Sequence, residues 1–141
     1  MAPLVSTIEI ARPPDEVFAY ATDPSRFAEW QHDVVRVRLL DGSRFTTTRR
    51  IRGAERTMTQ QITHNDPPHR WGARGTDGPI RPHATVSVEP IGDGTRSRVT
   101  FTLDFAAHGL GVALVPLVRR QARQAAPTSY QNLKQLLENG R

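Results

Sequence analysis

Two side chains near the middle of the chain each have chemistry that a catalytic site can use. Arg49 shares its strand parity with the apolar residues Phe45 and Ile51. A guanidinium on that face needs a carboxylate or a ligand oxygen, because an unpaired buried charge is costly. His64 lies on the next segment, and an imidazole can polarise a carbonyl or move a proton near neutral pH. We predict Arg49 and His64 as the candidate catalytic residues.

A structural role stays open for both residues. Arg49 can extend from a strand end into water while its methylene stem covers apolar surface. His64 precedes the turn at residues 65–68 and can be a solvent-exposed histidine. No nucleophile elbow, zinc-protease helix, phosphate-binding loop or dinucleotide fingerprint accompanies these two residues. An enzymatic activity therefore stays uncertain at this point.

The segment between residues 33 and 106 predicts a series of antiparallel strands. Apolar and polar residues alternate around Val37, Phe45, Ile62, Val86 and Phe101, the period of a half-buried strand. Glycine and proline clusters at 41–42, 65–68, 75–79 and 91–94 separate these runs. With residues 8–10 as a first strand, the sheet has about seven strands.

The residues after the first strand predict two short helices. Pro13 and Pro14 end the strand ladder and preset the first helical turn. Asp15 and Glu16 then sit where the helix dipole favours acids. Asp23 caps a second short turn that ends near Trp30. Trp30 is either a core residue under these helices or a residue whose edge also lines a pocket.

The C-terminal third changes to a helical period. Leu110, Leu114, Leu117 and Val118 recur at helical spacing, as do residues 130, 133, 136 and 137. Pro116 can begin this helix. Pro127 costs about 3 kcal/mol in a helix interior and predicts a kink or a break.

Composition and charge exclude several classes of protein. The chain of 141 residues carries a net charge of +5, but only Lys134 among its 19 basic residues is a lysine, and the arginines are dispersed. We therefore expect a solvated outer sheet face and no nucleic-acid partner. Without cysteine and without short histidine spacings, we expect no metal site and no cofactor. The chain has no run of about 20 apolar residues, so we expect no membrane insertion. A cytoplasmic location is expected.

Five motifs in order give the chain its resemblance to a known superfamily. They are residues 10–17, 23–30 and 66–69, Gly94 with Thr95, and residues 132–138. Together they resemble the SRPBCC superfamily, also called the Bet v 1-like or START-like helix-grip fold, and most closely its polyketide cyclase/dehydrase and lipid-transport branch. The resemblance covers essentially all of residues 1–141, as one domain. It implies an α+β helix-grip fold, with a curved antiparallel sheet wrapped around a long C-terminal helix.

The resemblance also implies a cavity between the sheet and that helix. Strand and helix parity then predict its ligand-binding residues, most of them apolar. Gln60 is the polar member that can orient a ligand carbonyl. The predicted lining is Tyr20, Trp30, Phe45, Met58, Gln60, Ile62, Trp71, Phe101, Leu103, Phe105, Leu114, Val118 and Ala122.

Three functions follow from the resemblance. The first is binding of a small hydrophobic molecule, such as a lipid, an isoprenoid or a polyketide, in the internal cavity. The second is a polyketide cyclase or dehydratase that uses Arg49 or His64 in the same cavity. The third is an interaction module similar to the chaperone-activator branch, in which outer-face arginines such as Arg36 and Arg38 contact a protein partner that the sequence does not identify.

Overall fold

The computed structural model describes residues 2–140 of the chain. The predicted seven strands, the two short helical segments after the first strand and the long C-terminal helix are all present. The order along the chain is β1 (Leu4–Ile10), α1 (Pro14–Ala21), the 3-10 turn η1 (Pro24–Arg26), α2 (Phe27–Trp30), β2 (Val34–Leu39), β3 (Arg44–Ile51), β4 (Ala54–Asp66), β5 (Arg70–Gly75), β6 (Ile80–Ile91), β7 (Arg96–Ala107) and α3 (Gly111–Asn139).

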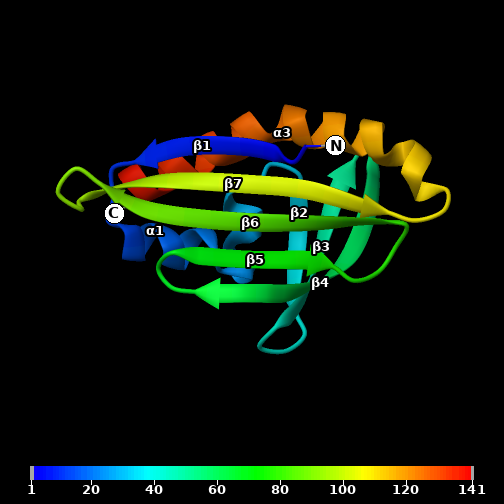
Figure 1. The fold of residues 1–141 in the computed structure, drawn as a ribbon, viewed down its shortest axis with the longest axis horizontal. Helices are drawn as coiled ribbons and strands as arrows, with labels where there is room; N and C mark the ends of the chain where they lie inside the picture. The colour runs from blue at the N-terminus through cyan, green and yellow to red at the C-terminus, as the bar shows by residue number, and fades with distance from the viewer. Residues whose placement is uncertain (1, 141) are drawn as a thin grey trace.

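One antiparallel sheet contains all seven strands, in the order β1-β7-β6-β5-β4-β3-β2. From β2 to β7 each strand pairs with the next along the chain, and β1 joins the last of them. Leu4 lies opposite Leu103, and Ile10 lies opposite Ser97. Figure 1 shows α3 running lengthwise beside β1 along one side of the curved sheet. This is the predicted helix-grip fold.

The segment after β1 folds as its prolines dictate. Pro13 is extended, with φ −64° and ψ 153°, and Pro14 is the first residue of α1. Val17 and Phe18 on one face of α1 are buried in the core. The carboxylate of Asp23 then accepts a hydrogen bond from the backbone nitrogen of the second residue of η1. These turns position α2 so that its indole, at position 30, is buried in the core.

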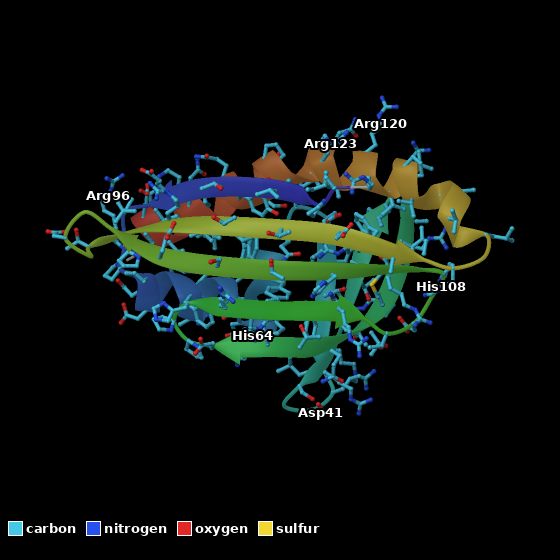
Figure 2. The ribbon with its side chains drawn as sticks, in the orientation of Figure 1. Asp41, His64, Arg96, His108, Arg120 and Arg123 are labelled. Carbon is cyan, nitrogen blue, oxygen red and sulfur yellow. The ribbon has the colours of Figure 1, made fainter. Side chains whose placement is uncertain are left out.

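A β-bulge changes which residues of β4 face the helix. Ile62 lies opposite Ala73, whereas His64 lies opposite Gly72, so the register shifts across Thr63. An extra residue in one strand reverses the side-chain parity beyond it. The prediction that His64 faces the same side as Ile62 is therefore wrong. His64 is exposed on the outer face of the sheet, where Figure 2 labels it.

The long helix α3 also differs from its prediction. It begins at Gly111, five residues before Pro116, and continues through Pro127 without a break. Leu114 is 47% exposed, so the prediction that it lines the interior is wrong. At 100° per residue, Leu114 and Leu117 lie about 80° and about 140° around the helix from the midpoint of Gly111 and Val115, where the sheet-facing stripe begins.

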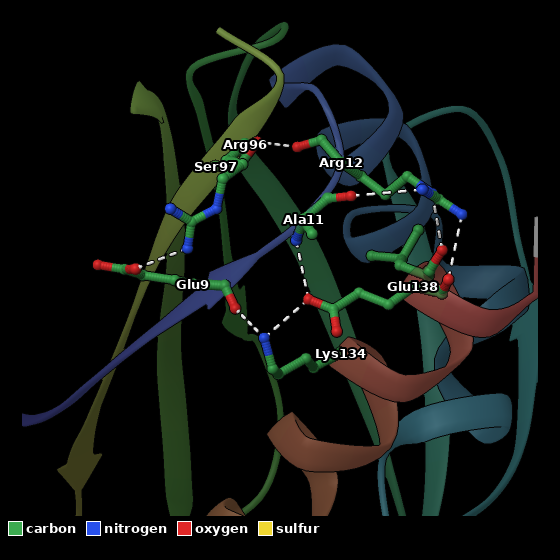
Figure 3. A network of polar contacts seen from close by, with 8 residues as sticks. Glu9, Ala11, Arg12, Arg96, Ser97, Lys134 and Glu138 are labelled. Carbon is green, nitrogen blue, oxygen red and sulfur yellow. Dashed lines mark hydrogen bonds and ion pairs between the residues drawn. The ribbon is translucent and has the colours of Figure 1, made fainter. Parts of the chain in front are cut away.

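Polar contacts fix the C-terminal end of α3 to β1 (Figure 3). The ammonium of Lys134 donates to the backbone oxygen of Glu9 at 2.6 Å and to the Glu138 carboxylate at 2.7 Å. The same carboxylate accepts from the backbone nitrogen of Ala11 at 2.8 Å. The guanidinium of Arg12 donates to the carbonyls of residues 137 and 138. The helix end is therefore satisfied by groups of the first strand and the residues after it.

Glu138→Gln should lower the free energy of unfolding by about 1 kcal/mol at neutral pH, because it weakens a charge-assisted hydrogen bond. The hydrogen bond from Lys134, followed by that from the Ala11 nitrogen, holds the pKa of Glu138 below its usual value against the effect of burial. A lowered folded-state pKa contributes stability above the unfolded-state pKa, and this stability is lost as the pH falls through the folded-state pKa. Urea unfolding should therefore separate the variant from wild type at neutral pH and not in strong acid.

The exposed residue Glu16 provides a matched control for this substitution. Glu16→Gln removes the same charge from a carboxylate that has no hydrogen-bond or ion-pair partner among residues 2–140. A change within about 0.5 kcal/mol is expected. Equal losses in both variants, or a Glu138→Gln loss that persists in acid, would contradict the assignment.

Candidate functional site

Aromatic side chains form a wall between α3 and the sheet. Trp30 lies with its ring centroid 6.0 Å from Phe101 and 6.3 Å from Tyr130. Tyr130, on α3, stacks on Phe101 with centroids 4.0 Å apart and planes 8° apart. Phe27 meets Trp30 edge-on at 6.1 Å. The helix and the sheet therefore meet through rings contributed by α2, β7 and α3.

The sheet residues of the predicted lining lie on one face, which we call the inner face. Directly opposed residues in neighbouring strands share a face. Phe45 therefore shares a face with Gln60, and Ile62 with Ala73. Trp71 lies opposite Val86, which in turn lies opposite Phe101. The inner face thus carries Phe45, Met58, Gln60, Ile62, Trp71, Phe101, Leu103 and Phe105. Val118 and Ala122 of α3 are half-buried.

Two polar side chains on the inner face hold each other. The hydroxyl of Thr47 donates to the amide oxygen of Gln60 at 2.9 Å, and both residues are buried. The bond occupies the oxygen of Gln60, so its amide nitrogen is the group left to meet a ligand carbonyl. This pair lies between the apolar residues Phe45 and Met58 of the same strands.

Arg49 is held by partners of its own chain. Its guanidinium donates to the Asp33 carboxylate at 2.6 Å and to the amide oxygen of Gln31 at 2.6 Å, and its side chain is one-third exposed. The carboxylate that this arginine needs is therefore supplied by the loop before β2. A ligand that used Arg49 would have to compete with Asp33.

Tyr130 is a neutral hydroxyl group in this interior. Burial raises the pKa of Tyr130 to about 12, and the positive charge of Arg49 opposes that shift. The phenol therefore keeps its proton through the physiological range and can donate a hydrogen bond. Sequence periodicity placed Tyr130 on the helix, but only the structure shows its stacking on Phe101.

Two buried donors lack a hydrogen-bond partner within residues 2–140: Nε1 of Trp30 and Nη1 of Arg119. Buried polar groups in folded proteins are nearly always paired, so each is a donor that the described residues leave without an acceptor. Arg119 was missed from the sequence. Its signal is its position, four residues after Val115 and three before Ala122, on the stripe of α3 that faces the sheet.

Besides Leu114, two predicted residues have polar ends that lie outside the interior, although the ring of Tyr20 packs against the core. The Tyr20 hydroxyl donates to the Glu29 carboxylate at 2.5 Å at the surface, and the Arg26 guanidinium lies over its ring. Burial and the hydrogen bond to Glu29 raise the pKa of Tyr20 to about 12. His64 is the other, and it therefore cannot join Arg49 around a ligand held between helix and sheet.

His64 instead borders a depression on the outer face of the sheet. The depression has a volume of about 270 Å³, and its polar lining includes Thr63, His64, Arg70 and His83. A second depression of about 330 Å³ lies between α2 and the C-terminal end of α3. Neither depression lies between α3 and the inner face.

The described residues contain no group of three histidine, cysteine or acidic side chains that could hold a metal ion. Among the helices of residues 2–140, none is long and apolar enough to cross a membrane.

A family model and several solved structures match this chain. The model described as polyketide cyclase/dehydrase and lipid transport matches residues 1–138. The Zhui aromatase/cyclase from a Streptomyces species aligns with a TM-score of 0.82 at 13% identity, over 98% of this chain and 96% of that one. A START superfamily protein from Mycobacterium smegmatis aligns with a TM-score of 0.80 at 15% identity, over the whole of both chains.

A conserved protein from Geobacillus kaustophilus shows the same architecture. It aligns with a TM-score of 0.75 at 17% identity, over 94% of this chain and 93% of that one. No curated protein sequence matches the chain. At these identities the structural likeness establishes the fold, and function must be argued from the site.

Proposed function

Since this chain belongs to the polyketide cyclase/dehydrase and lipid transport family, we propose that it binds a small hydrophobic molecule between α3 and the inner face of the sheet. The ligand is a lipid, an isoprenoid or a polyketide-like molecule. A cytoplasmic location and the absence of a nucleic-acid partner are parts of the same proposal.

The observation that carries the proposal is the uneven cover of the inner face. Near the C-terminal half of α3 the core side chains are closed off from water, with Leu133 and Val99 both 0% exposed. Towards its N-terminal half, apolar residues such as Leu103, Phe105 and Val118 face the same interior but are only half-buried. An apolar surface that faces inward and still meets water is typical of a ligand entrance.

Binding is favoured over cyclisation by the placement of the two catalytic candidates. Arg49 is neutralised by Asp33 at 2.6 Å, and His64 lies on the opposite face of the sheet. A cyclase of the second kind would use Arg49 or His64 in the interior, but Asp33 occupies the first and the second lies on the outer face. The geometry therefore supports a carrier or binder more strongly than an enzyme built on these two side chains.

Titration with the uncharged fluorophore N-phenylnaphthylamine tests the proposal. We expect a saturable rise in fluorescence with wild-type protein. Ala122→Phe should weaken binding at least tenfold, because it places a ring in the interior from a half-buried position on α3. Ala113→Phe is the matched control, because Ala113 is exposed on the same helix. Its binding should stay within twofold of wild type.

Thermal unfolding followed by circular dichroism checks that both variants are folded. The proposal fails if wild-type protein gives no saturable signal. It also fails if the two phenylalanine variants, both folded, lose binding to the same extent.

A further inference from the structure

Among residues 2–140, Arg119 is the only buried charged residue, with 9% of its surface exposed. It lies in the N-terminal half of α3, and a helical side chain reaches back over the preceding turn. That turn belongs to the N-terminal half of α3, beneath which the apolar side chains of the inner face are only half-buried. We propose that Arg119 makes this interior selective for a hydrophobic ligand with a carboxylate at one end, an inference that rests on the proposed function.

The side chain has no partner within the described chain. No hydrogen bond or ion pair involves its guanidinium, and Nη1 is both buried and unpaired. A buried guanidinium without a counter-charge is strongly unfavourable, because desolvation is not repaid. An anionic ligand oxygen would remove that cost.

The surrounding protein supplies no acid to take this role. Residues 105–137 contain neither aspartate nor glutamate. The acids on the elements that contact α3 are paired with other arginines: Glu9 with Arg96, Glu29 with Arg26, and Glu89 with Arg98. On α3 itself, Glu138 pairs with Lys134. Asp104 lies opposite His83 on the outer face of the sheet, and its carboxylate accepts a hydrogen bond from the backbone nitrogen of residue 105. The described residues thus give Arg119 no counter-charge, and a ligand can supply it.

The neighbouring arginines on α3 show that the burial of Arg119 is specific. Arg120 and Arg123 are exposed, and Figure 2 shows both pointing away from the sheet. Exposed arginines keep their water and do not require a partner. The same residue type on one helix thus provides both the candidate and its controls.

The chemistry of the site favours a carboxylate over a phosphate. The planar fork of a guanidinium matches the two oxygens of a carboxylate, and one positive charge balances one negative charge. A phosphate monoester carries up to two charges, and the apolar inner face gives the second no partner. The ligand we infer has an apolar body against Leu103 and Phe105 and a carboxylate at Arg119.

Displacement of bound N-phenylnaphthylamine by dodecanoate and by dodecanol tests the inference, because the two competitors differ in their head group and share a chain. Wild-type protein should prefer dodecanoate at least tenfold. Arg119→Gln should abolish this preference and leave dodecanol binding within twofold. Arg120→Gln and Arg123→Gln remove the same charge from the surface and should keep the preference.

A thermal readout independent of the fluorophore accompanies the displacement. Dodecanoate should raise the melting temperature of wild-type protein and of Arg120→Gln, but not that of Arg119→Gln. Without ligand, Arg119→Gln should melt no lower than wild type, since it removes an uncompensated buried charge.

The outcomes separate the inference from the proposed function. Equal displacement by acid and alcohol in wild type, or loss of preference in Arg120→Gln as well, overturns the role of Arg119 and leaves hydrophobic binding intact. Tighter binding of dodecyl phosphate than of dodecanoate overturns the assignment to a carboxylate. If the fluorophore itself does not bind, both the proposed function and the inference fail.

Discussion

Leu133→Ala is expected to lower the free energy of unfolding by about 3 kcal/mol, the usual cost of deleting a fully buried leucine side chain. Leu133 is 0% exposed and belongs to the same core as Trp30 and Phe101. The lost methyl groups leave a cavity that rigid aromatic neighbours fill poorly. Urea unfolding followed by circular dichroism measures the change, and a stable chain of this size has only about 5–15 kcal/mol to lose.

The same substitution elsewhere on α3 provides the controls. Leu136 is 40% exposed and Leu114 is 47% exposed, so Leu136→Ala and Leu114→Ala should each cost less than about 1 kcal/mol. If Leu114→Ala lowered the free energy of unfolding as much as Leu133→Ala does, then Leu114 would also face the sheet. That result would overturn the buried face described above.

Gly111→Ala should destabilise the protein by about 2 kcal/mol, although alanine is the better helix former. Gly111 is buried at the start of α3, and its nitrogen donates to the carbonyl of His108 at 3.0 Å. A Cβ atom at this position would collide with the backbone oxygen of Pro79 and lie 2.8 Å from its carbonyl carbon. Backbone atoms cannot move aside as a flexible side chain can, so the helix must shift away from the segment before β6.

Gly42→Ala is the matched control, because a Cβ there meets no atom within 4 Å and the backbone is outside the left-handed region. Its free energy of unfolding should change by less than about 0.5 kcal/mol. Stabilisation by Gly111→Ala, the sign that helix propensity alone predicts, would contradict the close approach of α3 to Pro79.

Local rules were enough to predict most helices and strands of this chain, and the family resemblance predicted their arrangement. Pro13 and Pro14 end one element and start the next, whatever the tertiary context. The turn predicted at residues 91–94 joins β6 to β7, and Gly92 and Gly94 take positive φ values of 64° and 90° there. Such signals depend on backbone conformation within a few residues, which is why they can be recognised in a sequence.

The candidate site was only partly predictable, because its details depend on packing between distant segments. The alternation of β4 correctly predicted that Met58, Gln60 and Ile62 share the inner face. No local sequence signal predicted the β-bulge that turns His64 outward. On α3 the spacing of Leu114 and Leu117 predicted the buried face, but both are exposed, and Gly111 lies on the buried face instead. Arg119 became a candidate only when its burial and its missing partner were known.

The pairing of β1 with β7 has a consequence for the order in which the protein can assemble during synthesis. Ile8 and Ile10 of the first strand find their partners only at Val99 and Ser97, close to ninety residues later. At ribosomal speed that interval is on the order of ten seconds. Throughout it, a strand with an apolar face must wait in the nascent chain, while the meander from β2 to β6 can already form between neighbours. Closure by the first strand is therefore among the last steps, and such long-range closure favours slow folding.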